Sequence, residues 1–254
     1  EERILNEFVK DEVDLIFSCP TETSIRAKKI ARGTGIPVLF SFANIEGTGL
    51  VESVRHPGGN ITGVRYPGPD IAIKRFEILL ELVPEAKHIL IPYQRGYPIV
   101  ASQINVLRPV AQSLNIRLDE VPASDTNELK VNLKAIAAGG ESKIDAILFI
   151  AEPLSVRPTA FKVIAEFAAK HHSPIAGILM SAGQYHSVIG VNVKIRESGR
   201  QAAVLAAKIL NGIPAGTIPV VSAENYIEIN YMEAQRQGLK VNEGLLSIAN
   251  KIIR

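Results

Sequence analysis

The feature that most constrains this 254-residue chain is the alternation of short apolar runs with amphipathic stretches. The run at 145–150, Asp-Ala-Ile-Leu-Phe-Ile, is almost purely apolar, as is typical of a strand in a parallel sheet that is covered on both faces. The segment 71–83 instead repeats apolar side chains at helical spacing, with Ile73, Phe76 and Leu80 on one face. Because this alternation runs through most of the chain, it predicts an α/β fold with parallel sheets and right-handed crossovers.

The same patterns predict the individual elements. Strands are expected at 13–18, 37–42, 61–64, 88–92, 116–121, 145–150, 174–178, 188–193 and 226–229. Helices are expected at 1–12, 22–33, 71–83, 99–114, 127–138, 159–171, 196–211, 232–237 and 245–253. We expect Pro109 to interrupt the fourth of these helices, and Thr21 or Thr23 to act as the N-cap of the second.

The stretch 50–66 contains an unusual break in the expected secondary structure. It is expected to open as a short helix, to break at Pro57-Gly58-Gly59 and to continue as the strand at 61–64. A Pro-Gly-Gly stop before a short β-branched strand is typical of a connector between two packed units, and not of a catalytic loop.

We expect two lobes, each built from non-contiguous segments, because polar breaks that suit lobe crossings occur at 66–69 and at 183–187. The first lobe is assigned to 1–66 and 190–217, and the second to 67–189 and 218–254.

Composition excludes several classes of protein. A net charge of only +2 does not indicate a nucleic-acid partner. One cysteine, Cys19, rules out an internal disulfide framework, and no apolar run is long enough to span a membrane. The polar opening residues are neither a signal peptide nor a lipoprotein anchor motif, so we expect a mature, trimmed or partial chain.

Ligands of open parallel sheets bind beyond the carboxyl ends of the strands, and this rule nominates loops for a binding role. The loop at 18–23 joins a strand to a helix start, where backbone N–H groups and the helix dipole favour an anion such as a carboxylate; a plain N-cap is the alternative. In the loop at 41–48, Asn44 offers an amide and Glu46 a carboxylate to a ligand amine, although Glu46 could simply begin a turn.

Three further loops, at 92–97, 151–155 and 180–183, follow strands of the second lobe. The loop at 92–97 carries two tyrosines and an arginine, which offer flat faces, polar tips and a grip on carboxylates. At 151–155, Glu152 suits a cationic ligand group or a helix N-terminus. The candidate ligand-binding residues are Cys19, Pro20, Thr21, Glu22, Thr23, Phe42, Asn44, Glu46, Tyr93, Arg95, Tyr97, Glu152, Pro153, Met180 and Ser181.

Catalytic patterns are weak, so we expect neither an enzyme nor a cofactor or metal site. Cys19 could be a nucleophile at a helix start, but no histidine lies near it in the sequence. The pair His171-His172 precedes Ser-Pro and is typical of a solvated helix end. Gly58-Gly59 lacks the Gly-Lys-Ser/Thr ending of a phosphate loop, and no G-x-S-x-G elbow is present.

Several segments together resemble the ABC_sub_bind family, the substrate-binding components of ABC importers with a type I periplasmic-binding-protein fold. They are HPGGNITGV with its GLVES lead-in, VDLIFSCPTETSIRAKK, ESGRQAAVLAAKILNGIPAGTIPV and the tail EINYMEAQRQGLKVNEGLLSIANKII. The resemblance implies two Rossmann-like lobes joined by a hinge, a ligand cleft between them, hinge closure on the ligand and delivery to a membrane permease. It also implies a periplasmic or extracellular, membrane-anchored location and a monomer or weak dimer.

The resemblance also bears on the ligand. Residues 19–21 match the family's Thr-Pro-type loop, and 44–46 its Thr-Asp-Pro region. Tyr-Gln-Arg-Gly-Tyr replaces the usual Asn-Pro, and Met180-Ser181 stands where Asp is frequent. These departures leave open an amino acid, an aromatic compound or a carboxylate. The first lobe is expected to lack the family's opening strand–helix–strand, which keeps open a ligand-sensing domain of a receptor or regulator.

Overall fold

The computed structural model describes residues 1–139 and 143–254 and divides into two compact units. Unit 1 comprises Glu1–Pro67 and Val193–Glu224, and unit 2 comprises Gly68–Asn192 and Asn225–Arg254. Both units are α/β and are built on sheets whose registered strand pairs run parallel, which confirms the predicted fold class.

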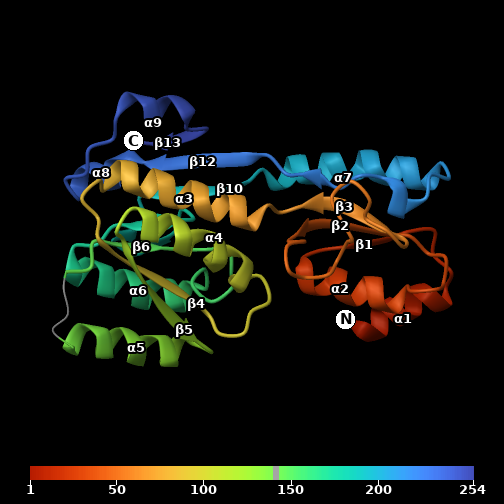
Figure 1. The fold of residues 1–254 in the computed structure, drawn as a ribbon, viewed down its shortest axis with the longest axis horizontal. Helices are drawn as coiled ribbons and strands as arrows, with labels where there is room; N and C mark the ends of the chain where they lie inside the picture. Colours follow the sequence, from red (N-terminus) through yellow and green to blue (C-terminus); the bar gives the residue numbers. More distant parts are fainter. Residues whose placement is uncertain (140–142) are drawn as a thin grey trace. The chain divides into compact units, whose positions relative to one another are not determined.

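Unit 1 is a four-stranded parallel sheet between helices. The strand order is β1 (Ile16–Ser18), β2 (Val38–Ala43), β3 (Ile61–Arg65) and β11 (Val221–Ser222). The helices are α1 (Glu2–Lys10), α2 (Thr21–Ile30), α7 (Ile195–Leu210) and the short η1 (Ala215–Thr217). Figure 1 shows α1 and α2 on one face of the sheet and α7 on the other. Fully buried Val38, Phe40 and Ile61 form the centre of this core.

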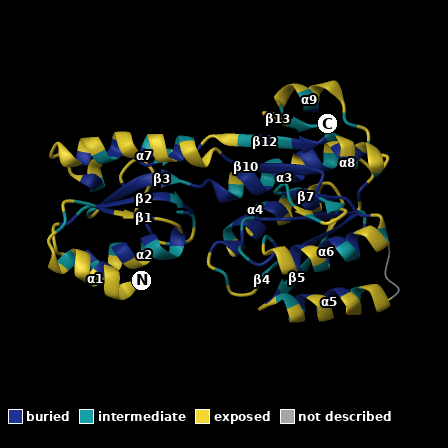
Figure 2. Ribbon diagram, turned by 180° about the vertical axis from the view of Figure 1, so that it is seen from behind, coloured by how far each residue is buried: buried dark blue, intermediate teal, exposed yellow. Residues whose placement is uncertain are grey.

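Unit 2 is built on a larger sheet. Its strand order is β13 (Lys251–Ile253), β12 (Asn225–Asn230), β10 (Ile189–Val193), β7 (Ile175–Gly177), β6 (Ala146–Leu148), β4 (His88–Gln94) and β5 (Arg117–Ala123). The helices are α3 (Gly68–Leu82), α4 (Val100–Ser113), α5 (Thr126–Ala138), α6 (Pro158–His171), α8 (Tyr231–Arg236) and α9 (Glu243–Ile248). A separate hairpin pairs β8 (Ser181–Ala182) with β9 (Tyr185–His186). Figure 2 shows buried central strands and helices that are exposed on their outer sides.

The lobe boundaries differ from those expected. The chain passes between the units after Pro67, Asn192 and Glu224. The segment 190–192 belongs to unit 2, because β10 pairs with β7 there. The segment 218–224 belongs to unit 1, because β11 pairs with β3. The polar break at 183–187 is not a crossing, since it lies in and just after the β8–β9 hairpin inside unit 2.

The stretch 50–66 also departs from expectation. It lies wholly within unit 1, so it does not connect the two units. Residues 50–56 form bends in place of a helix, and Val54 O accepts a hydrogen bond of 2.8 Å from Val220 N. Farther on, Gly58 N donates to Gly216 O at 3.1 Å, and Thr62 Oγ1 donates to Ile218 O at 2.7 Å. The stretch therefore anchors the chain between α7 and β11 to the rest of unit 1.

Three local predictions are wrong for identifiable reasons. α4 continues through Pro109 without interruption. Residues 251–253 form β13 in place of a helix end, because they pair in parallel with β12. The N-cap of α2 is Pro20, because both Thr21 and Thr23 lie inside the helix, and the Thr21 hydroxyl accepts from Asn44 N at 3.0 Å.

Gly63 in β3 tests the packing of unit 1. A Cβ at this position would lie 2.1 Å from Phe40 O and 2.5 Å from the Phe40 ring, so Gly63→Ala must displace the central strand. We expect a loss of about 1–3 kcal/mol in the free energy of unfolding, measured by urea denaturation. Gly199→Ala in α7 is the matched control, since beyond the neighbouring backbone of its own helix no described atom lies within 4 Å of the added Cβ. It should raise stability by about 0.5–1 kcal/mol, and equal stability of the two variants would contradict the packing described.

Candidate functional site

The parallel strands of unit 1 bring polar side chains together at the edge where the strands end. Asn44 follows β2, and its backbone N–H donates to Thr21 Oγ1, just beyond β1. Arg65, the last residue of β3, forms an ion pair with Glu46, and its Nε donates to Ser222 Oγ of β11 at 2.7 Å. Residues from four separate segments of unit 1 therefore meet at one edge, as expected for parallel strands.

Asn44 is the member of this group that points most directly to a ligand. It is 1% exposed, and neither its Oδ1 nor its Nδ2 has a hydrogen-bond partner among the described residues. A buried polar group without a partner costs about 1–3 kcal/mol. Glu22 follows Thr21 in the sequence, and its Oε2 atom is likewise buried without a partner in the described chain. Such groups are matched to a ligand or to bound water.

Phe42 adds an aromatic element to the same edge. Its φ is 55°, and it is the extra residue of a β-bulge between Ser41 and Ala43. The half-buried ring meets Tyr66 edge to face, with the ring centroids 5.0 Å apart. Bulges re-aim side chains, and strained backbone of this kind concentrates at functional sites.

The loop before α2 offers backbone N–H groups to a ligand, and its side chains are not reactive. Cys19 is exposed, yet desolvation of its sulfur raises the pKa of the thiol, which disfavours a nucleophilic thiolate. Pro20 carries the N-cap position, and Thr23 is half-buried in the first turn. Because no side chain within the described residues caps α2, its first N–H groups remain available to an anion.

In unit 2, Glu152 holds two strand-end loops together. It is 6% exposed, and its Oε2 accepts from Gln94 N at 2.9 Å and from Leu154 N at 2.6 Å. Its Oε1 accepts from Ser155 N at 2.6 Å. Ser155 Oγ in turn donates to Pro92 O at 3.1 Å. The carboxylate is thus committed to backbone donors, and Pro153 lies in the turn that it closes.

Tyr93 and Arg95 are engaged within unit 2. Tyr93 Oη donates to Glu120 of β5 at 2.7 Å. Burial is the larger cause, and this hydrogen bond the second, of a rise in the pKa of Tyr93 to about 12. Arg95 forms an ion pair with Glu128 of α5. Tyr97 lies half-buried farther along the loop, and its backbone N–H donates to Gln94 O at 3.3 Å.

The segment after β7 lies against the core of unit 2. Met180 packs on that core, and its N–H donates to Ser187 Oγ at 2.7 Å. Ser181 contacts His186 Nδ1 at 3.0 Å across the β8–β9 hairpin. These contacts keep the start of the hairpin in a fixed conformation.

Three residues that the structure places at the candidate sites were not predicted from the sequence. Arg65 and Ser222 tie the edge of unit 1 together, and Gln94 has a buried Oε1 without a partner in the described chain. Gln94 lies inside a loop that the strand-end rule nominated, and Arg65 directly follows the predicted strand at 61–64. Ser222 belongs to a two-residue strand, which leaves no periodic signal.

Comparisons with known proteins identify the family and the fold. The family model described as ABC transporter substrate binding protein matches residues 2–253. The chain belongs to this family. The family is one of substrate-binding proteins and not of enzymes, which agrees with the expectation from the sequence. None of the described helices is long and apolar enough to cross a membrane, and the described residues hold no metal-binding cluster of His, Cys, Asp or Glu.

Individual relatives are distant. A tyrosine-binding protein of Clostridioides difficile is 25% identical over 224 residues, and the match spans 87% of this substrate-binding protein and 61% of that relative. A conserved domain protein from Vibrio cholerae superposes with a TM-score of 0.81 at 23% identity, covering 99% of this chain and 82% of the other. An ABC domain from Streptococcus pneumoniae in complex with L-Trp gives 0.80 at 20%, covering 99% and 85%. These structures confirm the two-lobe, periplasmic-binding-protein-like fold.

Glu152→Gln tests the role of the buried carboxylate in this substrate-binding protein. The amide places an NH₂ group against backbone N–H donors, so at least one donor loses its acceptor. We expect the free energy of unfolding to fall by about 1–3 kcal/mol, and the amides of Gln94 and Ser155 to exchange faster with deuterium. Glu81→Gln, at an exposed position of α3, should change neither quantity. Unaltered exchange at Gln94 in the Glu152 variant would contradict the described network.

Proposed function

We propose that this chain is the solute-binding component of an ABC importer and that its solute is an aromatic amino acid. Family membership supports the transport role, and two relatives are described with tyrosine or L-Trp. The observation that carries the proposal is the buried Asn44 amide, which has no partner among the described residues and lies beside Thr21 at the strand-end edge of unit 1.

The polar groups of unit 1 suit both ends of an amino acid. The Oδ1 atom of Asn44 and the Oε2 atom of Glu22 are buried acceptors without partners in the described chain, and an ammonium group would supply donors to them. The uncapped start of α2 presents N–H groups and a positive dipole end, which favour a carboxylate. One loop region would therefore recognise the zwitterion.

Phe42 supports the preference for an aromatic solute. At this bulge the half-buried Phe42 ring packs edge to face on the buried Tyr66 ring, and the exposed part of Phe42 offers a contact to a third ring. A solute with an aliphatic side chain would bury apolar surface against Phe42 but would not form a ring–ring contact with it. Phe42 and Tyr66 therefore favour tyrosine or tryptophan over leucine.

Unit 2 has candidate solute contacts of its own in its strand-end loops. We assign solute contacts there to Gln94, whose Oε1 lacks a partner among the described residues, and to Tyr97. Glu152, Tyr93 and Arg95 would act indirectly, because their polar atoms already bind groups of unit 2. Met180 and Ser181 would shape the segment after β7.

Several parts of the proposal concern the whole protein. The match spans 61% of the tyrosine-binding relative's length. Delivery to a permease, hinge closure on the ligand, and a periplasmic or extracellular, membrane-anchored location stay predictions. The family match favours transport over the ligand-sensing alternative, and a neighbouring permease gene in the complete locus would support it.

Asn44→Ala tests the solute site. Isothermal titration calorimetry with L-tyrosine and L-tryptophan should show saturable binding to the wild type, and no binding of D-glucose. Removing the buried amide should weaken binding about 10- to 100-fold, which corresponds to the loss of one or two buried hydrogen bonds.

The control for this test is Asn127→Ala, at an exposed position of α5, which should bind as the wild type does. A bound solute should also raise the melting temperature, since it binds only the folded chain. No binding of either aromatic amino acid by the wild type would refute the assigned solute class. Wild-type affinity in the Asn44 variant would refute the assigned contact.

A further inference from the structure

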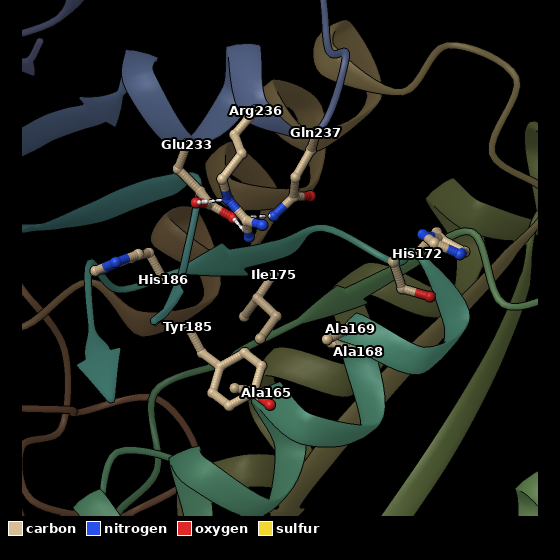
Figure 3. A pocket seen from close by; sticks show the side chains of 11 residues that line it. Ala165, Ala168, Ala169, His172, Ile175, Tyr185, His186, Glu233, Arg236 and Gln237 are labelled. Carbon is tan, nitrogen blue, oxygen red and sulfur yellow. Dashed lines mark hydrogen bonds and ion pairs between the residues drawn. The ribbon is translucent and has the colours of Figure 1, made fainter. Parts of the chain in front are cut away.

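Unit 2 contains a pocket of about 300 Å³ that is distinct from its strand-end loops. Its lining includes the C-terminal half of α6, the first residue of β7, the hairpin strand β9 and the short helix α8 (Figure 3). Ile175 and Ser173 line the pocket where the chain enters β7, whereas solute loops follow the ends of strands. The pocket therefore lies away from Gln94 and Tyr97, and its rim residue His186 contacts Ser181 Oγ at 3.0 Å.

Small side chains on α6 create the space. Ala165, Ala168 and Ala169 line the pocket at positions three and four residues apart, so they share one face of the helix. Figure 3 shows this face opposite α8, with Ile175 between them, and Tyr185 also lines the pocket. One side of the pocket is therefore apolar and presents an aromatic ring.

The opposite side carries a fixed charge. Glu233 of α8 is 3% exposed, and its carboxylate accepts from Arg236 Nε at 2.8 Å and Nη2 at 2.6 Å. Gln237 Nε2 also donates to this carboxylate. Hydrogen bonding to Glu233 raises the pKa of Arg236, which keeps the guanidinium charged. Figure 3 shows these three side chains turned toward one another over Ile175.

The Glu233–Arg236 pair carries no net charge, but the N–H donors that Arg236 retains favour an anion over a cation. Glu233 is the acid among the described lining residues, and its oxygens are already engaged by Arg236 and Gln237. Arg236 is held in place by two of its nitrogens and still presents Nη1, while His172 and His186 add ring nitrogens at the rim. A cation would meet no available carboxylate, whereas a carboxylate would meet a positioned guanidinium.

We propose that this pocket binds a small organic monocarboxylate with a compact apolar body. The carboxylate contacts Arg236, and the apolar body packs on the alanine face of α6 and on Tyr185. Pockets of this size with an apolar wall and a few convergent polar groups are typical of small-molecule sites. The assignment does not depend on the identity of the transported solute.

Benzoate is a suitable probe, with benzylamine as its cationic counterpart. Saturation-transfer difference NMR on the wild-type chain should show transfer to the ring protons of benzoate and none to benzylamine. Ala169→Leu places a larger side chain at an exposed position that lines the pocket, and should abolish the benzoate signal. Ala203→Leu makes the same change at an exposed position of α7 in unit 1, and should retain it.

Two further measurements separate this pocket from the solute site. Asn44→Ala should leave the benzoate signal unchanged, and Ala169→Leu should leave tyrosine affinity unchanged. Absence of transfer to benzoate, an equal signal in the Ala169 variant, or loss of the signal in the Asn44 variant would each overturn the proposal. Equal transfer to benzylamine would overturn the assignment to an anion.

Discussion

In unit 1, the parallel hydrogen bonding of β1, β2, β3 and β11 is the constraint on which the candidate site depends. Parallel strands must return by crossovers, so each carboxyl end is followed by a loop at the same edge of the sheet. That geometry brings Thr21, Asn44, Arg65 and Ser222 together although they are as many as 200 residues apart in the chain. The same pairing requires the chain to return after α7, which the contacts from Gly58 and Thr62 make possible.

Buried polar groups separate architecture from function in the two units. Glu152 is buried with both carboxylate oxygens engaged, so it stabilises the loops around it. Asn44 is buried with its amide unengaged in the described chain, which lowers stability unless a ligand or water supplies partners. The sequence presented both as polar residues after a strand. Only the positions of neighbouring N–H groups distinguish a structural carboxylate from a binding amide.

Much of the fold could be predicted because most strands and helices carry a local periodic signal. The buried run around β6 and the amphipathic α3 are examples, and the strand-end rule nominated the loops that hold Asn44, Gln94 and Glu152. Two-residue strands such as β11 have too few positions for a pattern, so long-range pairing alone decides which sheet they join. Side-chain direction was equally inaccessible: Tyr93 looked available to a ligand, but it faces Glu120 across the β4–β5 pair.

The pocket of unit 2 follows a different physical logic from the strand-end loops. α6 packs Phe161 and Ile164 into the core, while Ala165, Ala168 and Ala169 line the pocket, where a larger side chain would fill the space. On α8, the buried Glu233 needs a partner, and Arg236 supplies it with a two-point contact that also fixes the guanidinium in place. The ion pair between Glu233 and Arg236 stabilises α8. It also holds the Arg236 guanidinium in a fixed orientation beside the apolar wall of the pocket. That combination, more than the volume of the pocket, is what selects a carboxylate over a neutral or cationic occupant.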